Sequence, residues 1–219
     1  MRATGSADGA GPSPIPPLHL ITDDRILAEE RFPARARSVM EAGGERVALH
    51  LRGPRTTGRR LYDLALLLRE EAARTGAWLV VNDRVDIARM SGATGVQLGA
   101  RGMEIGDARA LLGREARIGA SVHHAEEAVR AGAAGADFLL VGTLFETASH
   151  PGRRGRFEVL EGCAAADLPM VGIGGITPAR TGRVREAGAR GVAVIRGVWE
   201  APEPAAAVED YLSEWGSDG

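Results

Sequence analysis

The chain has 219 residues and a net charge of −2 at pH 7, with 44% apolar and 26% charged residues. These values predict one soluble domain with a well-filled core, and they exclude the general basic surface of a nucleic-acid-binding protein. No apolar run approaches the roughly 20 residues that cross a bilayer, so we expect no membrane association.

The types of basic and sulfur-containing residue restrict the reactions and the binding sites that the chain can support. All 27 basic residues are arginine, so no lysine can form a Schiff base or carry pyridoxal phosphate. Arginine, histidine or backbone N–H groups must therefore hold any anion. The single cysteine, Cys163, can form no internal disulfide, which fits a reducing cytoplasm. We expect it to pack inertly on a helix.

The first 16 residues are rich in glycine, proline, serine and alanine. They cannot form a core, and they lack the apolar segment of a signal peptide. We therefore expect a disordered N-terminal tail at 1–16 and a single folded domain at 17–219.

From Leu18 onward, short apolar runs alternate with longer amphipathic segments. The runs are rich in valine, isoleucine and leucine and end at glycine, aspartate, asparagine or proline, as strands buried on both faces do. Eight strands are predicted, at 18–22, 47–51, 78–81, 95–98, 117–121, 138–141, 170–173 and 191–195.

A helix-compatible segment follows each predicted strand. Apolar residues at 61, 64, 65 and 68 have helical spacing, Pro178 suits a first helical turn, and a last helix is expected at 205–214. Eight strand–helix units predict an α/β fold, a closed (β/α)8 TIM barrel with a parallel core. An open doubly wound sheet is the alternative, but no GxGxxG follows the first strand.

Active sites of such barrels lie at the C-terminal ends of the strands. Gly174 and Gly175 follow the seventh strand, and Arg196 and Gly197 follow the eighth. Because glycine lets backbone N–H groups approach an anion closely, we predict that these four residues bind a phosphate. A plain tight turn is the alternative.

Other polar residues follow the remaining strands. His123 is the candidate for acid–base catalysis because imidazole titrates near neutral pH, although it could only cap the next helix. Asp83 and Asp86 are expected to cap a helix and to form a salt bridge, because one carboxylate without a second acid predicts no metal site. The loop at 149–156 is either a solvated loop or an anion-gripping lid.

Together these segments resemble the thiamine phosphate synthase/TenI superfamily over about residues 18–215. The matching pieces occur in family order, and they are LITD (20–23), HLR (50–52), NDRVDIA (82–88), GVQL (95–98), GxSVH (119–123), ADF (136–138), FET (145–147), IGGI (173–176) and GVAV (191–194). The resemblance implies the same (β/α)8 barrel.

The synthase branch of this superfamily joins a pyrimidine pyrophosphate to a thiazole phosphate with Mg²⁺, two acids and lysines. The chain departs from that pattern in three places. His50 and Pro54 stand where its Q-x-R-E-K motif has glutamine and lysine, Gly102 falls at the second acid, and His150 stands at a lysine.

The TenI branch is more similar, since it carries H-x-R, S-V-H and F-E-T. The resemblance therefore implies a thiazole tautomerase of thiamine biosynthesis, which isomerises a carboxythiazole phosphate without a metal. The acid–base group is expected to be His123 or His50. The expected substrate-binding residues are Arg52, Asn82, Ser121 and Thr147.

No cofactor is expected, and the expected partner is a small phosphorylated thiazole. A homodimer is a candidate assembly. Two alternatives remain open, namely a divergent, Mg²⁺-dependent thiamine phosphate synthase and a non-catalytic sensor of a phosphate ligand that regulates a partner protein.

Overall fold

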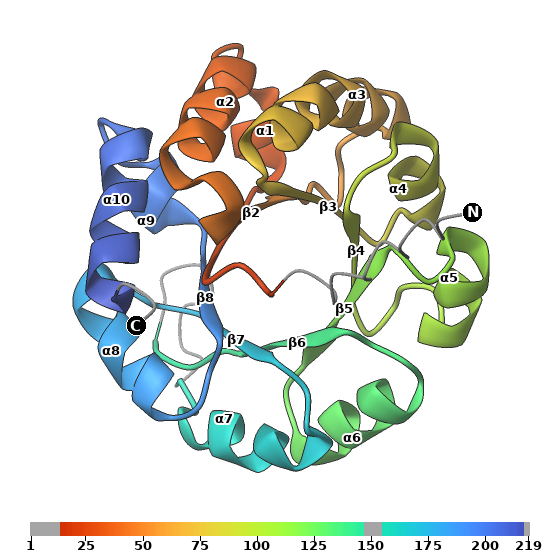
Figure 1. The fold of residues 1–219 in the computed structure, drawn as a ribbon, viewed down its shortest axis with the longest axis vertical. Coiled ribbons are helices and arrows are strands. Elements are labelled where there is room, and N and C mark those ends of the chain that lie inside the picture. Colours follow the sequence, from red (N-terminus) through yellow and green to blue (C-terminus); the bar gives the residue numbers. More distant parts are fainter. Residues whose placement is uncertain (1–13, 147–154, 217–219) are drawn as a thin grey trace, which may run out of the picture.

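The structure, a computed structural model, describes residues 14–146 and 155–216. Eight parallel strands form a closed barrel in chain order, with β1 paired to β8 (Figure 1). The strands are β1 (Leu18–Ile21), β2 (Val47–Leu51), β3 (Trp78–Asn82), β4 (Gly95–Leu98), β5 (Arg117–Val122), β6 (Phe138–Gly142), β7 (Met170–Ile173) and β8 (Gly191–Val194). The predicted TIM barrel is confirmed, and every strand begins at its predicted residue.

Helices cover the outside of the barrel (Figure 1). They are α1 (Asp24–Ala28), α2 (Phe32–Gly43), α3 (Gly58–Thr75), α4 (Val85–Ser91), α5 (Ile105–Leu112), α6 (Ala125–Ala133), α7 (Glu158–Cys163), α8 (Pro178–Glu186), α9 (Arg196–Trp199) and α10 (Pro204–Trp215), with 3-10 turns η1 (Gly44–Arg46) and η2 (Ala164–Ala166). Within the described residues, no helix is both long and apolar enough to cross a bilayer.

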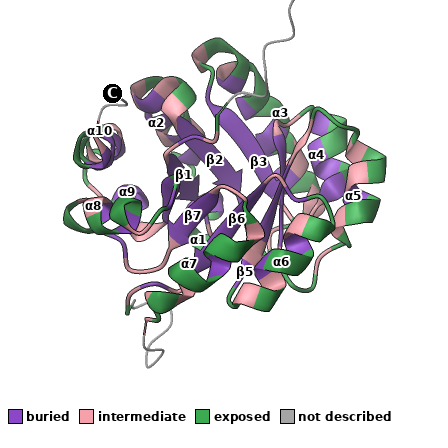
Figure 2. Cartoon of the chain, turned by 60° about the horizontal axis from the view of Figure 1, so that its bottom comes forward, coloured by how far each residue is buried: buried purple, intermediate pink, exposed green. Residues whose placement is uncertain are grey.

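Two apolar layers hold the barrel together. The larger lies between the outer faces of the strands and the inner faces of the helices, and the smaller fills the inside of the barrel. The strands are accordingly buried on both faces, while the helices are exposed on their outer faces (Figure 2). The continuous apolar runs of the sequence reflect this double burial.

Apolar and polar side chains share the inside of the barrel. The apolar residues are Ile21, Ala48, Trp78, Val80, Phe138, Leu140, Val171 and Ala193. The fully buried polar side chains of β1, β2 and β4 are His19, His50 and Gln97.

The N-terminal end of the barrel is closed by the residues before β1. Ile15 packs against the inner apolar cluster, and Pro16 is buried. The prediction of a disordered tail at 1–16 is therefore wrong for these two residues, while residues 1–13 lie outside the described residues. The Pro17 carbonyl accepts a 2.8 Å hydrogen bond from the N–H of Val192 in β8. The cavity of the barrel therefore opens only at the other end within the described residues.

The helix α8 begins at Pro178 as predicted, and α10 spans Pro204–Trp215 where 205–214 was expected, but the prediction for Asp83 is wrong. Asp86 forms the expected ion pair with Arg84 at 2.5 Å, and Cys163 is buried as expected. Asp83 does not cap α4, however, because its φ of 58° lies in the left-handed region and its Oδ1 accepts the N–H of Gly99 at 2.8 Å. The aspartate thus links the end of β3 to the end of β4.

Candidate active site

A cavity of about 1160 Å³ opens at the C-terminal ends of the strands. Its lining includes the following charged and polar residues: Asp23, Arg52, Asn82, Asp83, Arg101, Ser121, His123, Thr143, Glu146, Thr177, Arg180, Arg196, Glu200 and Tyr211. This volume is slightly above the upper end of the usual range for ligand pockets, about 1,000 Å³.

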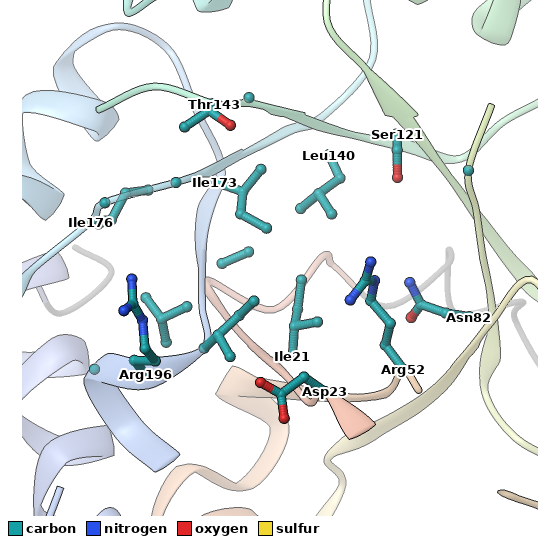
Figure 3. A pocket seen from close by; sticks show the side chains of 18 of the residues that line it. Ile21, Asp23, Arg52, Asn82, Ser121, Leu140, Thr143, Ile173, Ile176 and Arg196 are labelled. Carbon is teal, nitrogen blue, oxygen red and sulfur yellow. The ribbon is translucent and has the colours of Figure 1, made fainter. Parts of the chain in front are cut away.

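The cavity has an apolar middle between two polar sides. Ile21, Leu140 and Ile173 lie in its centre, Arg52 and Asn82 on one side, and Arg196 on the opposite side (Figure 3). An elongated ligand can therefore place a ring in the middle and an anionic group at either side.

The loop after β7 supplies the predicted phosphate-binding glycines. Gly174 and Gly175 have φ values of 104° and 63°, which favour glycine. The Gly174 carbonyl accepts the N–H of Phe145 at 3.0 Å. Because the two ends of a trans peptide point in opposite directions, the Gly175 N–H points away from Phe145. A side chain at either glycine would also collide with the loop after β6.

The loop after β8 lies against α10. A Cβ at Gly197 would overlap the hydroxyl of Tyr211, and this hydroxyl donates to the Ile176 carbonyl at 2.9 Å. The structure therefore requires glycine at 197 for packing against Tyr211. Arg196 and Gly197 both line the cavity beside the β7 loop, so the four predicted phosphate-binding residues do come together.

Arg180 is a cavity residue that the sequence analysis missed. Its Nη1 donates to the Gly175 carbonyl at 2.6 Å, and its guanidinium lies 4.7 Å from the ring centre of Phe145. The signal for it was present, because Arg180 is in the first turn of the helix that starts at Pro178, directly after the glycine loop.

Thr22 fixes the backbone that carries Arg52. Its fully buried Oγ1 accepts the N–H of Arg52 at 2.8 Å and lies 3.1 Å from the carbonyl oxygen of His50. The guanidinium of Arg52 then projects into the cavity beside Asn82 (Figure 3). Arg52 thus stands where the sequence predicted a substrate-binding residue.

Asn82 and Ser121 also line the cavity, and Thr147 lies outside the described residues. The Ser121 Oγ accepts a 3.0 Å hydrogen bond from Nε2 of the buried Gln97. Because this acceptor site is occupied, the hydroxyl hydrogen of Ser121 remains to donate to a ligand.

His123 lies at the mouth of the cavity, with its side chain 48% exposed. Its N–H donates to Oε2 of Glu127 at 2.6 Å, and its Nδ1 lies 3.5 Å from the same oxygen. Burial alone would raise the pKa of Glu127, but the hydrogen bond and charge of His123 lower it. The ionised Glu127 carboxylate therefore lies beside the imidazole and holds the backbone of His123 through the hydrogen bond to its N–H.

His50 does not reach the cavity, in contrast to its prediction as a second acid–base group. Its side chain is fully buried below the cavity floor, and burial lowers its pKa well below the usual value. Its Nε2 is 2.8 Å from Nδ1 of His19. The residue points inward because it is in the same phase of β2 as Ala48, which lies in the inner cluster.

The described residues do not fit a resident magnesium site. Of the carboxylates that line the cavity, Asp83 stands at the end of β3, and one of its oxygens already accepts the Gly99 N–H. At the place of a second acid stands Gly102, where a Cβ would lie 2.9 Å from the Asp83 Oδ1. No group of three histidine, cysteine, aspartate or glutamate residues with ligand geometry occurs in the described part of the chain.

Comparison with known proteins identifies related chains. Residues 18–198 match the family model described as thiamine monophosphate synthase. A thiamine-phosphate synthase of Salinispora arenicola is 39% identical over 89% of this chain and 95% of its own length. A thiamine phosphate pyrophosphorylase structure from Pyrococcus furiosus has a TM-score of 0.78 and 33% identity, covering 90% of this chain and 94% of that one.

The bifunctional protein ThiM/ThiE of Symbiobacterium thermophilum is 47% identical over 69% of this chain. The chain spans only about a third of that protein, since the match covers 32% of it.

The predicted thiazole tautomerase is wrong on these findings. The related chains carry the name of the synthase, and the similarity to them extends over nearly the whole barrel. The tautomerase prediction rested on changes at a few rim positions, including His50 and Gly102. One of those side chains, His50, does not line the cavity at all.

Proposed function

Because the chain belongs to the thiamine monophosphate synthase family, we propose that it is a transferase that joins a pyrimidine pyrophosphate to a thiazole phosphate. In this reaction the thiazole nitrogen forms a bond to the pyrimidine methylene carbon. The carbon–oxygen bond to pyrophosphate breaks, and its electron pair leaves with the pyrophosphate.

One observation carries this proposal: a single cavity joins the glycine loop of β7 to the arginine-bearing ends of β2 and β4. We place the thiazole phosphate at Gly174, Gly175, Arg196 and Gly197. The two rings then meet at Ile21, Leu140 and Ile173 in the middle of the cavity (Figure 3). This arrangement brings two reactants together in one orientation, which lowers the entropic part of the barrier.

Charge on the leaving group is the main electrostatic demand of the reaction. Arg52 and Arg101 line the cavity on the side away from the glycine loop, and His123 lines its mouth. The positive charges of the two arginines stabilise the departing pyrophosphate where the family pattern uses lysine. No step is assigned to a protein-bound metal, because the described residues do not form its site.

The test is direct conversion by the full chain. Pyrimidine pyrophosphate and thiazole phosphate are incubated with the protein, in Mg²⁺ and in a chelator, and thiamine phosphate is detected by mass spectrometry together with released pyrophosphate. We expect both products in a ratio of one to one. Absence of thiamine phosphate in both buffers, with both substrates bound by calorimetry, would overturn the proposal.

Arg52→Gln provides the matching variant. We expect kcat/KM for coupling to fall about 10²-fold, because a charged donor at the leaving group is lost. The control is Arg114→Gln, an exposed arginine before β5 at the opposite end of the barrel. Equal activity of the two variants would remove Arg52 from the site.

A further inference from the structure

A chain of hydrogen bonds between buried polar groups runs inside the barrel. The Pro16 carbonyl lies 3.0 Å from Nε2 of His19, and Nδ1 of His19 lies 2.8 Å from Nε2 of His50. Both imidazoles are fully buried. The chain begins at the closed N-terminal end and rises toward the cavity, although neither ring lines it.

The Pro16 carbonyl fixes the donor-to-acceptor direction of these hydrogen bonds. A carbonyl oxygen only accepts, so Nε2 of His19 must carry the hydrogen that donates to Pro16. Burial lowers the pKa of His19 to about 3, so the ring is neutral at physiological pH and its Nδ1 is an acceptor. The hydrogen between the two rings therefore belongs to Nε2 of His50.

His50 is in turn neutral, because burial and the neighbouring His19 lower its pKa. A neutral imidazole with its hydrogen on Nε2 has a lone pair on Nδ1. This Nδ1 is buried and has no hydrogen-bond partner. A buried acceptor of this kind needs a hydrogen-bond donor.

Asn82 is the neighbour that can supply this donor. His50 pairs with Val80 across β2 and β3, so Asn82, two residues further, faces the same side of the sheet. Its side chain interacts with the His50 ring, yet its buried Oδ1 also has no hydrogen-bond partner. Turning the carboxamide by half a rotation exchanges Oδ1 and Nδ2 in the same space. Nδ1 of His50 then gains a donor, and Oδ1 of Asn82 leaves the place where it has no partner.

We propose that the His19–His50 pair positions the Asn82 carboxamide, so that Nδ2 donates to Nδ1 of His50 and Oδ1 faces the cavity as an acceptor. His19 and His50 are then positioning residues, and Asn82 is the specificity-determining residue that they orient. The role of Asn82 toward its substrate rests on the proposed function, whereas the direction of the buried chain does not.

The consequence for recognition is a fixed polarity at one point of the cavity. Asn82 lies beside Arg52 (Figure 3), whose guanidinium only donates. An acceptor at Asn82 next to a donor at Arg52 selects a ligand edge with an N–H or O–H donor beside an acceptor or anion. A phosphate oxygen is disfavoured at Asn82 itself, which keeps the ring edge and the anionic group of a substrate in separate places.

The direction of the hydrogen bonds between Pro16, His19 and His50 can be measured without any substrate. In the full chain labelled with ¹⁵N, two-bond ¹H–¹⁵N spectra of the histidine rings are recorded at pH 7, with His19 and His50 assigned by single substitutions. We expect both rings to be neutral Nε2–H tautomers. A hydrogen on Nδ1 of His50, or a charged ring at either residue, would overturn the proposal.

Two variants test the consequence for Asn82. Asn82→Asp replaces the donor by a carboxylate, so we expect KM for one coupling substrate to rise about tenfold and the His50 ring to gain a hydrogen on Nδ1. An Asn82→Asp variant with unchanged KM and an unchanged His50 tautomer would show that Nδ2 makes no such bond.

His50→Gln and His50→Leu form the matched pair. A glutamine can accept from Asn82 and donate to His19, so it should restore a KM near that of the native chain, whereas leucine should raise KM about tenfold. Equal KM values for the two variants would contradict the positioning role. If the native chain does not couple the substrates, the proposed function fails while the tautomer measurement still stands.

Discussion

At the scale of single residues, the cavity depends on buried groups that hold its lining from behind. Thr22 bonds the backbone of Arg52, and Gln97 bonds the hydroxyl of Ser121. Neither Thr22 nor Gln97 lines the cavity. Because these bonds are buried, losing one leaves a polar group without a partner, which costs more than the bond itself contributes.

Thr22→Val tests this support. Valine keeps the shape but removes the hydroxyl, so we expect the free energy of unfolding to fall by about 1–2 kcal/mol and KM for coupling to rise. Urea unfolding followed by tryptophan fluorescence gives the first value, and kinetics give the second. Thr22→Ser, which keeps the hydroxyl, is the control, and equal losses in both variants would argue against the hydrogen bond as the cause.

Gly102→Asp tests the absence of a metal site. The new side chain would start 2.9 Å from Oδ1 of Asp83, so two carboxylates would face each other. In a chelator we expect the free energy of unfolding to fall by about 1 kcal/mol or more, and the melting temperature to fall with it. Both should recover in Mg²⁺. Gly102→Asn should show no such recovery. An equal rise of the native melting temperature in Mg²⁺ would contradict the absence of a resident site.

At the scale of elements, α10 closes the molecule and also supports the phosphate side of the cavity. It packs on α2 and α8 beside the end of β8 (Figure 1). Tyr211 of α10 is 2% exposed and bonds the Ile176 carbonyl directly after the glycine loop. The helix α10 therefore stabilises the loops after β7 and β8, both of which precede it in the sequence.

Tyr211→Phe should make these loops less ordered without creating a cavity in the core. The phenyl ring keeps the packing, but the Ile176 carbonyl loses its donor, so we expect a loss of about 1 kcal/mol in stability. The Kd for thiazole phosphate should rise by several-fold, measured by calorimetry, because the glycine loop is less well ordered. An unchanged Kd would show that the loop keeps its conformation without the hydroxyl.

At the scale of the whole molecule, the barrel encloses polar groups that ordinary cores exclude. Two neutral imidazoles lie inside the strands, at positions where the unfolded chain would expose them to water. The folded protein therefore binds fewer protons than the unfolded chain at mildly acidic pH, and its stability is linked to pH.

Acid titration measures this linkage. Below the usual histidine pKa of about 6.5 the unfolded chain is protonated and the native rings are not, so stability falls as pH falls, by about 1.4 kcal/mol per pH unit for each ring. For His19 the loss continues down to its lowered pKa of about 3. The Asp86 carboxyl, whose pKa the Arg84 hydrogen bond lowers, adds to the loss only below about pH 4.

We expect His50→Gln to reduce the slope of stability against pH between 5 and 6.5 by about half, as one of two buried rings is removed. His124→Gln, which removes an exposed histidine, is the control and should leave the slope unchanged. Stability that does not vary over this range in the native chain would contradict neutral burial of the pair.

The sequence by itself determined the barrel and the location of its rim. Strands buried on both faces are local apolar runs, so their starts could be read without the fold. Gly174 and Gly175 could be identified because their position after a strand and their lack of a side chain are properties of the local chain. The cavity residues Arg52, Asn82, Ser121 and His123 follow from the same strand ends.

Only the tertiary structure decided what lies behind that rim. A strand that is apolar on both faces has no alternation that shows which residues point inward, so the placement of His50 under the cavity could not be predicted. Its partner His19 is 31 residues away, and Tyr211 reaches a carbonyl 35 residues distant. Such contacts depend on strand register and helix packing. Neither of these is encoded in a local pattern of the chain, so the contacts could not be predicted.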